Sequence, residues 1–162
     1  MATERATVTF AAGGQDVSLA LHNRPYATAE DDWDRDVITA IIAAKTGDFR
    51  GGVATVLWAR ELAHLRVLLV DLHQHVGQEQ RAAFATIEPA LGLTFRLSRL
   101  GHLHVDVQLC TDIGLESEAL LAFSLAADQS YLPTWIAALT HALEFFPPAT
   151  HSLTTPPEVH RK

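Results

Sequence analysis

Hydrophobic residues change their spacing along the chain, and this change limits the folds that the sequence can adopt. Between residues 58 and 76 they recur at steps of three and four, the spacing of one face of an α-helix about five turns long. Gly77 follows, where a helix stop is expected. The stripe consists of Trp58, Leu62, Leu65, Leu69, Leu72 and Val76.

The sequence before this helix has the spacing of β-strands. Residues 7–10 and 17–21 alternate apolar and polar side chains, and the glycine pair at 13–14 favours a hairpin between them. Residues 37–42 are apolar on both faces, which predicts a central strand covered on both sides. Residues 49–57 are expected to return as its partner, with a bulge or a close backbone approach at the glycine pair within them.

Four further strands are expected after the helix, and a second helix follows them. The last of these strands is apolar on both faces and is therefore expected to be buried. The expected strands are residues 81–87, 93–97, 103–109 and 119–127. The final helix has Ser130 as its expected N-cap and a stripe formed by Leu132, Trp135, Ile136, Leu139, Leu143 and Phe146.

This order predicts an α+β fold, because runs of strands are separated by single helices. We expect a mainly antiparallel fold of seven or eight strands with two long amphipathic helices, in the order ββββ-α-ββββ-α. Residues 1–148 are interpreted as one domain. Residues 149–162 lack periodicity and are interpreted as a loosely ordered tail.

Composition excludes several classes of protein. The chain has 162 residues, of which 48% are hydrophobic and 19% charged, so it can bury a large core. Its single cysteine, Cys110, excludes an internal disulfide framework and is expected to be a small buried thiol. No apolar run is long enough to span a bilayer, and no signal-peptide core is present. We therefore expect a soluble cytoplasmic protein that binds no membrane.

The net charge of −7 makes nucleic acid an unfavourable partner, because no basic cluster offsets the overall repulsion from phosphates. Glycine-rich phosphate loops and the serine nucleophile motif G-x-S-x-G are absent. Glu61 and Asp71 on the first helix are interpreted as solvent-facing charges. We therefore expect no catalytic residue and no cofactor.

An acidic cluster before the central strand is the first candidate site. Its residues are Glu30, Asp31, Asp32, Trp33, Asp34 and Asp36. The spacing of Asp32, Asp34 and Asp36 opens like a calcium loop, but Val37 occupies the position that needs glycine. The cluster is either a solvated loop or a docking patch for a basic partner. An aromatic anchor ringed by charge suits an interface, although Trp33 could equally plug the core.

The alternation of His102, His104 and Asp106 places three metal-ligand types on one face of one strand, about 6.5–7 Å apart in steps of two residues. A hairpin centred near residue 100 would put Arg96 opposite His104 and diagonal to Asp106, within reach of an ion pair. A neighbouring arginine discourages a cation, so we expect no metal here and interpret these residues as the wet face of the hairpin.

The order of motifs along residues 8–147 resembles the WapI-type immunity proteins and related bacterial families of unknown function. The resemblance is carried by Asp31-Asp32-Trp33, Gly47-Asp48-Phe49-Arg50-Gly51, Glu61-Leu62, Phe84…Glu88…Leu91, Gly101-His102-Leu103-His104-Val105 and Asp128-Gln129-Ser130-Tyr131-Leu132. It implies a small cytoplasmic protein that binds and neutralises a toxin domain. It implies no catalytic residues.

Our first hypothesis is a non-enzymatic binding protein of immunity type. Its partner would be a protein, for which a basic toxin domain is the expected example, and its surface would comprise the acidic cluster with Arg96. A metal-dependent or small-molecule enzyme using His102, His104 and Asp106 is one alternative. The other is an oligomeric structural module, for which the simplest assembly is a homodimer.

Overall fold

The computed structural model describes residues 5–111 and 114–149. It contains two four-stranded antiparallel sheets, which confirms the predicted α+β class and the order ββββ-α-ββββ-α. In each sheet the strands lie in sequence order. The first sheet consists of β1 (Ala6–Ala12), β2 (Gln15–Leu21), β3 (Val37–Thr46) and β4 (Phe49–Trp58). The second consists of β5 (Gln80–Ala85), β6 (Leu91–Leu97), β7 (His102–Thr111) and β8 (Ala119–Asp128).

The helices connect and close these sheets. A single turn, α1, precedes β3, and α2 links the two sheets. The final helix, α3, follows a short 3₁₀ segment. Their bounds are α1 (Asp32–Arg35), α2 (Ala59–Gln74), η1 (Gln129–Tyr131) and α3 (Leu132–Phe145). No helix among the described residues is long and apolar enough to cross a membrane.

Tight turns fix the register of the hairpins. Gly13 and Gly14 both have positive φ, of 60° and 78°, as a two-residue type I′ turn requires, and they pair Ala12 with Gln15. Gly101, with φ of 85°, helps to turn β6 into β7. An added Cβ at this glycine would meet the end of the Gln129 side chain at 2.7 Å, which can move, so the positive φ is the main reason for glycine here.

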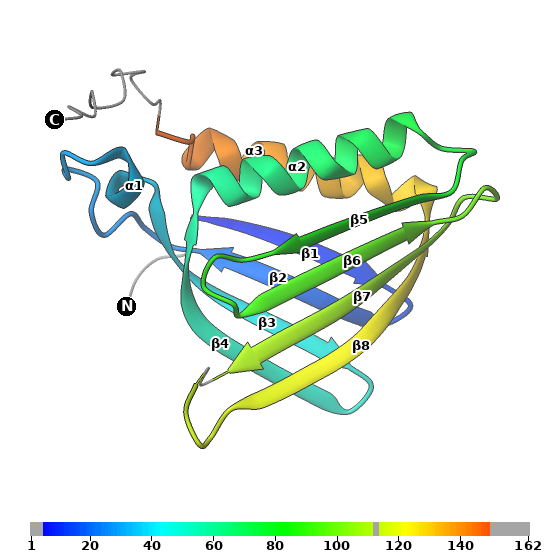
Figure 1. Ribbon diagram of the computed structural model, residues 1–162, viewed down its shortest axis with the longest axis horizontal. Helices are drawn as coiled ribbons and strands as arrows, with labels where there is room; N and C mark the ends of the chain where they lie inside the picture. The colour runs from blue at the N-terminus through cyan, green and yellow to red at the C-terminus, as the bar shows by residue number, and fades with distance from the viewer. Residues whose placement is uncertain (1–4, 112–113, 150–162) are drawn as a thin grey trace, which may run out of the picture.

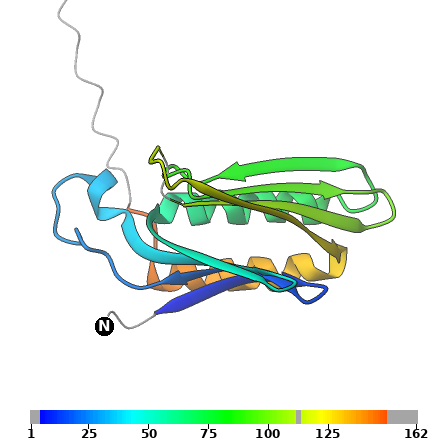
Figure 2. The ribbon, with the colours of Figure 1, turned by 90° about the horizontal axis from the view of Figure 1, so that it is seen from below.

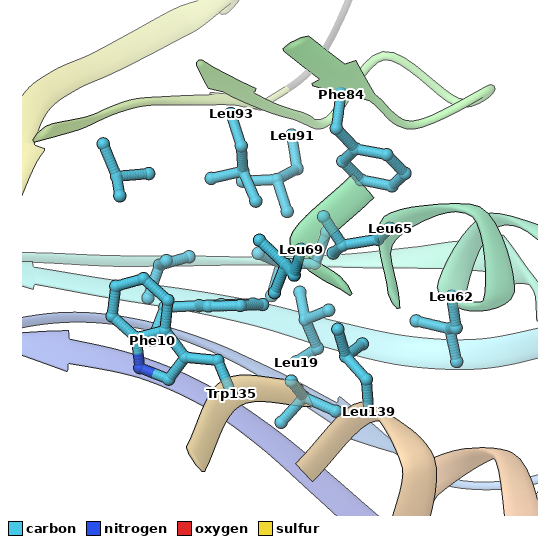
Figure 3. Close-up of a cluster of buried hydrophobic side chains, with 14 of the residues drawn as sticks. Phe10, Leu19, Leu62, Leu65, Leu69, Phe84, Leu91, Leu93, Trp135 and Leu139 are labelled. Carbon is cyan, nitrogen blue, oxygen red and sulfur yellow. The ribbon is translucent and has the colours of Figure 1, made fainter. Parts of the chain in front are cut away.

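The core lies between the two sheets and is completed by the helices. Figures 1 and 2 show α2 and α3 side by side along one side of the sheet pair, where α3 lies against β1 and α2 against β5. The α2 leucines insert between the sheets. Figure 3 shows Leu62, Leu65 and Leu69 between Phe84, Leu91 and Leu93 of the second sheet and Phe10 and Leu19 of the first.

The two helical stripes lie mostly on buried faces, as predicted, but Val76 lies beyond the end of α2 and is exposed. Leu62, Leu65, Leu69 and Leu72 are buried, and Gly77, with φ of 93°, follows the end of α2. Trp135 of α3 is buried edge-to-face on Phe10, with ring centroids 5.4 Å apart. This contact joins the last helix to the first strand.

Three details of the strands differ from the sequence-based expectation. The β3–β4 pairing runs without interruption from Val37↔Trp58 to Thr46↔Phe49, so the glycine pair forms no bulge. β3 is central, but its outer face is open, and Ile41 is 44% exposed there. β8 was expected to be buried, yet only Leu125 in it is buried, because the strand lies at the edge of its sheet.

The expectations for the helix cap before α3, for Cys110 and for Glu61 also need correction. The carboxylate of Asp128, not Ser130, caps the segment before α3, since it accepts a hydrogen bond from the Ser130 N–H at 2.8 Å. Cys110 is half-buried, not buried. Glu61 is buried instead of solvent-facing. Of the predicted tail, only Ala149 lies among the described residues.

The layered core generates a prediction for stability. Leu65→Ala should lower the free energy of unfolding by about 3 kcal/mol, because it leaves a cavity between the two sheets. Val67→Ala on the same helix is the control, since Val67 is 59% exposed and its truncation should change stability by less than about 0.5 kcal/mol. Urea denaturation of both variants measures the difference, and equal values would contradict the packing described here.

Candidate functional site

The acidic cluster forms a defined turn at one end of the molecule. We call residues 30–36 the acidic turn. The Asp31 carboxylate caps α1 by accepting a hydrogen bond from the Trp33 N–H at 2.6 Å. Asp32 forms an ion pair with Arg35 within the turn. The predicted loop is therefore one capped helical turn.

Asp36 ties this turn to the rest of the fold. It is 0% exposed, although the sequence placed it in the candidate docking patch. Its Oδ2 accepts hydrogen bonds from the Arg60 backbone N–H at 3.0 Å and from Arg60 Nε at 2.8 Å. Its Oδ1 accepts one from the Ala149 N–H at 2.8 Å, and its carbonyl accepts one from the Ala59 N–H at 2.9 Å. One residue thus joins the end of α1, the start of α2 and the segment after α3.

The electrostatics of Asp36 follow from these contacts. Burial acts to raise the pKa of the carboxyl, because it penalises the charged form. The hydrogen bonds from Arg60 and Ala149, together with the charge of Arg60, outweigh burial and lower the pKa of Asp36 below its ordinary value. Asp36 is therefore ionised at neutral pH and paired.

Arg24 makes a second connection at the same end. Its guanidinium donates to the Arg35 carbonyl at 2.7 Å and to the Pro147 carbonyl. Arg24 thus connects the C-terminal end of α1 to the segment after α3. Together with the contacts of Asp36, these bonds connect the acidic turn to α2 and to the segment after α3.

Trp33 is held on the outside of this junction. Its ring lies 5.2 Å from the ring of Trp58, and the Arg60 guanidinium lies 4.7 Å from its centroid, in a cation–π arrangement. The indole remains 43% exposed. Trp33 is therefore a surface residue with a fixed orientation, not a core plug.

Three carboxylates of the acidic turn face solvent. Glu30, Asp31 and Asp34 are exposed, and no ion pair joins any of them to a residue that the structure describes. Their negative charge therefore acts on the surroundings of the protein. Together with Trp33 they form an exposed aromatic surrounded by acidic groups.

Arg96 lies elsewhere. The predicted register of the β6–β7 hairpin is confirmed, since Arg96 pairs with His104. The predicted ion pair is also present, because Arg96 Nη2 lies 2.8 Å from Asp106 Oδ2. Arg96 belongs to the arrowhead end of β6, whereas α1 lies at the opposite end of the molecule (Figure 1). The structure does not bring Arg96 together with the acidic turn.

The three metal-ligand candidates share the outer face of β7, as predicted, but they do not converge. Asp106 accepts hydrogen bonds from Arg96 and, at 2.6 Å, from the Ser124 hydroxyl. The Ser124 hydrogen bond has the largest effect on the pKa of Asp106 and lowers it; desolvation opposes this shift, and the charge and hydrogen bond of Arg96 lower the pKa further. A carboxylate of lowered pKa is a weak base at neutral pH, so it would activate the Ser124 hydroxyl poorly. Within residues 5–111 and 114–149, no three His, Cys, Asp or Glu side chains are placed to hold a metal ion.

Glu61 is a buried carboxylate whose role was missed in the sequence. It accepts hydrogen bonds from the Trp58 N–H at 2.6 Å and from the Ile87 N–H at 2.5 Å, so it links the start of α2 to the β5–β6 connection. Burial raises the pKa of Glu61 even though both hydrogen bonds oppose the shift. The signal was the spacing of three residues between Trp58 and Glu61, which is that of a capping box.

Two comparisons bear on this arrangement. The family model described as the immunity protein WapI-like family matches residues 9–147, a span that includes the acidic turn, α2, α3, the second sheet and the first sheet apart from the beginning of β1. No curated protein matches the chain.

Substitution of Asp36 tests whether its charge holds together α1, the start of α2 and the segment after α3. Asp36→Asn should lower the free energy of unfolding at neutral pH by about 3 kcal/mol, because it removes the buried negative charge that accepts two hydrogen bonds from Arg60. The pKa of Asp36 is lower in the folded than in the unfolded state. Its stabilisation is therefore complete above about pH 4, the unfolded value, and is lost as the pH falls through the folded pKa. The gap between wild type and variant should accordingly shrink below about pH 4.

Denaturant unfolding at a series of pH values measures this gap. Asp34→Asn is the matched control, because Asp34 is exposed and makes no ion pair with a described residue. A gap that does not change with pH would show that the Asp36 charge does not hold the junction.

Proposed function

The chain belongs to the immunity protein WapI-like family, and from this membership we propose that it neutralises a toxin domain by binding it directly, without catalysing a reaction. The observation that carries the proposal is the acidic turn. It presents Glu30, Asp31 and Asp34 around an exposed Trp33 on a backbone held by Asp36. The partner is a protein with a basic surface.

Physical chemistry supports this assignment of the surface. Clustered negative charges speed association with a basic partner and select its orientation, even when they add little affinity. Affinity then comes from an aromatic anchor that is desolvated in the complex. Because Trp33 is already oriented by Trp58 and Arg60, less side-chain entropy is lost when it binds.

The proposed role can be tested in cells. The tagged chain is used to capture proteins from its source organism, and the captured polypeptides are identified by mass spectrometry. Each is then expressed in a heterologous host with and without this chain. We expect one captured polypeptide to arrest growth alone and to be harmless when the chain is present. If every captured polypeptide is harmless alone, the proposal of toxin neutralisation is wrong.

The charges of the acidic turn should govern the association rate. The double variant Asp31→Asn, Asp34→Asn should associate with the captured partner about 3- to 10-fold more slowly at low salt, because steering by charge is lost. Asparagine also caps helices, so α1 should remain folded. The difference should disappear at about 0.5 M salt, where screening acts over a few ångströms. Stopped-flow fluorescence measures these rates.

The matched control for this prediction removes the same charge elsewhere. Asp48 and Glu79 are exposed carboxylates in other connections, between β3 and β4 and between α2 and β5. The double variant Asp48→Asn, Glu79→Gln should associate at nearly the wild-type rate. Equal slowing in both double variants would assign the effect to net charge instead of to the acidic turn.

Trp33 should act mainly on dissociation. Trp33→Ala removes the proposed anchor and should weaken the complex by roughly 30-fold or more, largely through faster dissociation. Surface plasmon resonance measures both rate constants. Trp33→Phe, which retains an aromatic ring, should recover part of the affinity, and an unchanged dissociation rate in Trp33→Ala would remove Trp33 from the interface.

A further inference from the structure

Strand β8 has one side without a neighbour in its sheet. The second sheet has the order β5-β6-β7-β8, so β7 pairs with one side of β8 only. No backbone hydrogen bond joins residues 119–127 to another described element on the other side. The opposite edges, β1 and β5, lie against α3 and α2. Most of β8 lies away from both helices, and only its C-terminal end, which continues into η1, approaches α3 and β1 (Figure 1).

The phase of the β7–β8 ladder shows which backbone groups are available. The Gln129 N–H donates to the Gly101 carbonyl at 2.8 Å, so this pair is a hydrogen-bonded one. Antiparallel pairs alternate between bonded and non-bonded, and the non-bonded residues direct their N–H and C=O away from the partner strand. In β8 the outward-directed groups therefore belong to Leu120, Ala122, Ser124 and Ala126.

The side chains of β8 leave this edge accessible. Residues 119–127 contain no charged residue and no proline, the usual means by which edge strands avoid pairing with other chains. Leu120 is 63% exposed, and Leu121 and Phe123 are only half-buried. An added strand would cover these side chains as well as satisfy the backbone groups.

The acidic residues at the two ends of β8 favour one kind of added strand over another. Glu116 and Glu118 precede the strand, and Asp128 ends it. In a pair of two β8 strands, acidic residues would face acidic residues in either orientation, which is destabilising. A second copy of this chain is therefore disfavoured, whereas a strand with basic ends is attracted.

We propose that β8 is a docking edge for an extended segment of the protein partner, with an apolar middle and Lys or Arg at both ends. The segment adds as a fifth strand to the second sheet, by β-augmentation. This inference rests on the proposed function only in its choice of a basic protein partner. In Figure 1, β8 begins on the same side of the molecule as α1, at the opposite, lower edge of that side.

Proline substitution at the two free edges tests the proposal. Ala122→Pro removes an outward N–H from β8 and leaves the β7–β8 ladder intact. Ala54→Pro is the matched control on β4, because the bonded pair of Asp36 and Ala59 sets the phase so that the Ala54 N–H also points outward. Isothermal calorimetry with the captured toxin should show at least tenfold weaker binding for Ala122→Pro and unchanged binding for Ala54→Pro. Thermal unfolding confirms that both variants are folded.

A second measurement needs no toxin. A nine-residue peptide of alternating Val and Thr with Lys at both ends is titrated into the isotopically labelled chain, alongside the same peptide with Glu at both ends. We expect the Lys-ended peptide alone to shift the amide resonances of residues 120–126. Shifts confined to other residues, or equal shifts with both peptides, would overturn the proposal. So would a dimer in sedimentation velocity that Ala122→Pro dissociates, because the occupant would then be a second copy.

The two proposals fail in different ways. If wild type protects cells and Ala122→Pro protects equally while binding the toxin with unchanged affinity, the docking edge is wrong and toxin neutralisation stands. If no captured polypeptide is toxic, neutralisation fails, and the peptide titration alone decides whether β8 accepts a basic strand.

Discussion

A buried carboxylate organises the end of the molecule on which its proposed function depends. Asp36 is removed from water, and a buried charge is tolerated only when it is paired and hydrogen-bonded. Its partners come from α2 and from the segment after α3, so the first connection, the central helix and the end of the last helix are fixed together. The same contacts hold the backbone of the acidic turn, which carries the exposed side chains. A surface of charged side chains thereby gains a defined geometry.

The helices make the two sides of the sheet pair unequal. They seal the side formed by β1 and β5, where Trp135 packs on Phe10 and the α2 leucines fill the space between the sheets (Figure 3). On the other side, β4 and β8 keep free edges. The core extends across both sheets, and β8 contributes Leu125 to it while most of its other side chains stay exposed. This asymmetry explains how a sequence that is apolar on both faces forms an edge strand.

The candidate sites show which kinds of contact a sequence can reveal. The Arg96–Asp106 ion pair was predictable, because a short turn fixes the register and alternation fixes the face. Asp36 was placed in a solvated loop or docking patch, and Glu61 was interpreted as a solvent-facing helix charge, because nothing in the adjacent sequence marks either carboxylate as buried. What distinguishes these two residues is contact with partners 24 to 113 residues away along the chain. No local pattern encodes such distances.

The sequence by itself determined the α+β class, the order of the strands and the two long helices, most of the helical stripes and the register of the β6–β7 hairpin, because each depends on spacing within a short segment. Tertiary structure alone decided that β8 is an edge strand, that Asp36 is buried while Asp34 is exposed, and that Arg96 lies far from the acidic turn. The reason is physical. Periodicity states which side of an element is apolar, but burial depends on what packs against that side. That neighbour is supplied by a distant part of the chain.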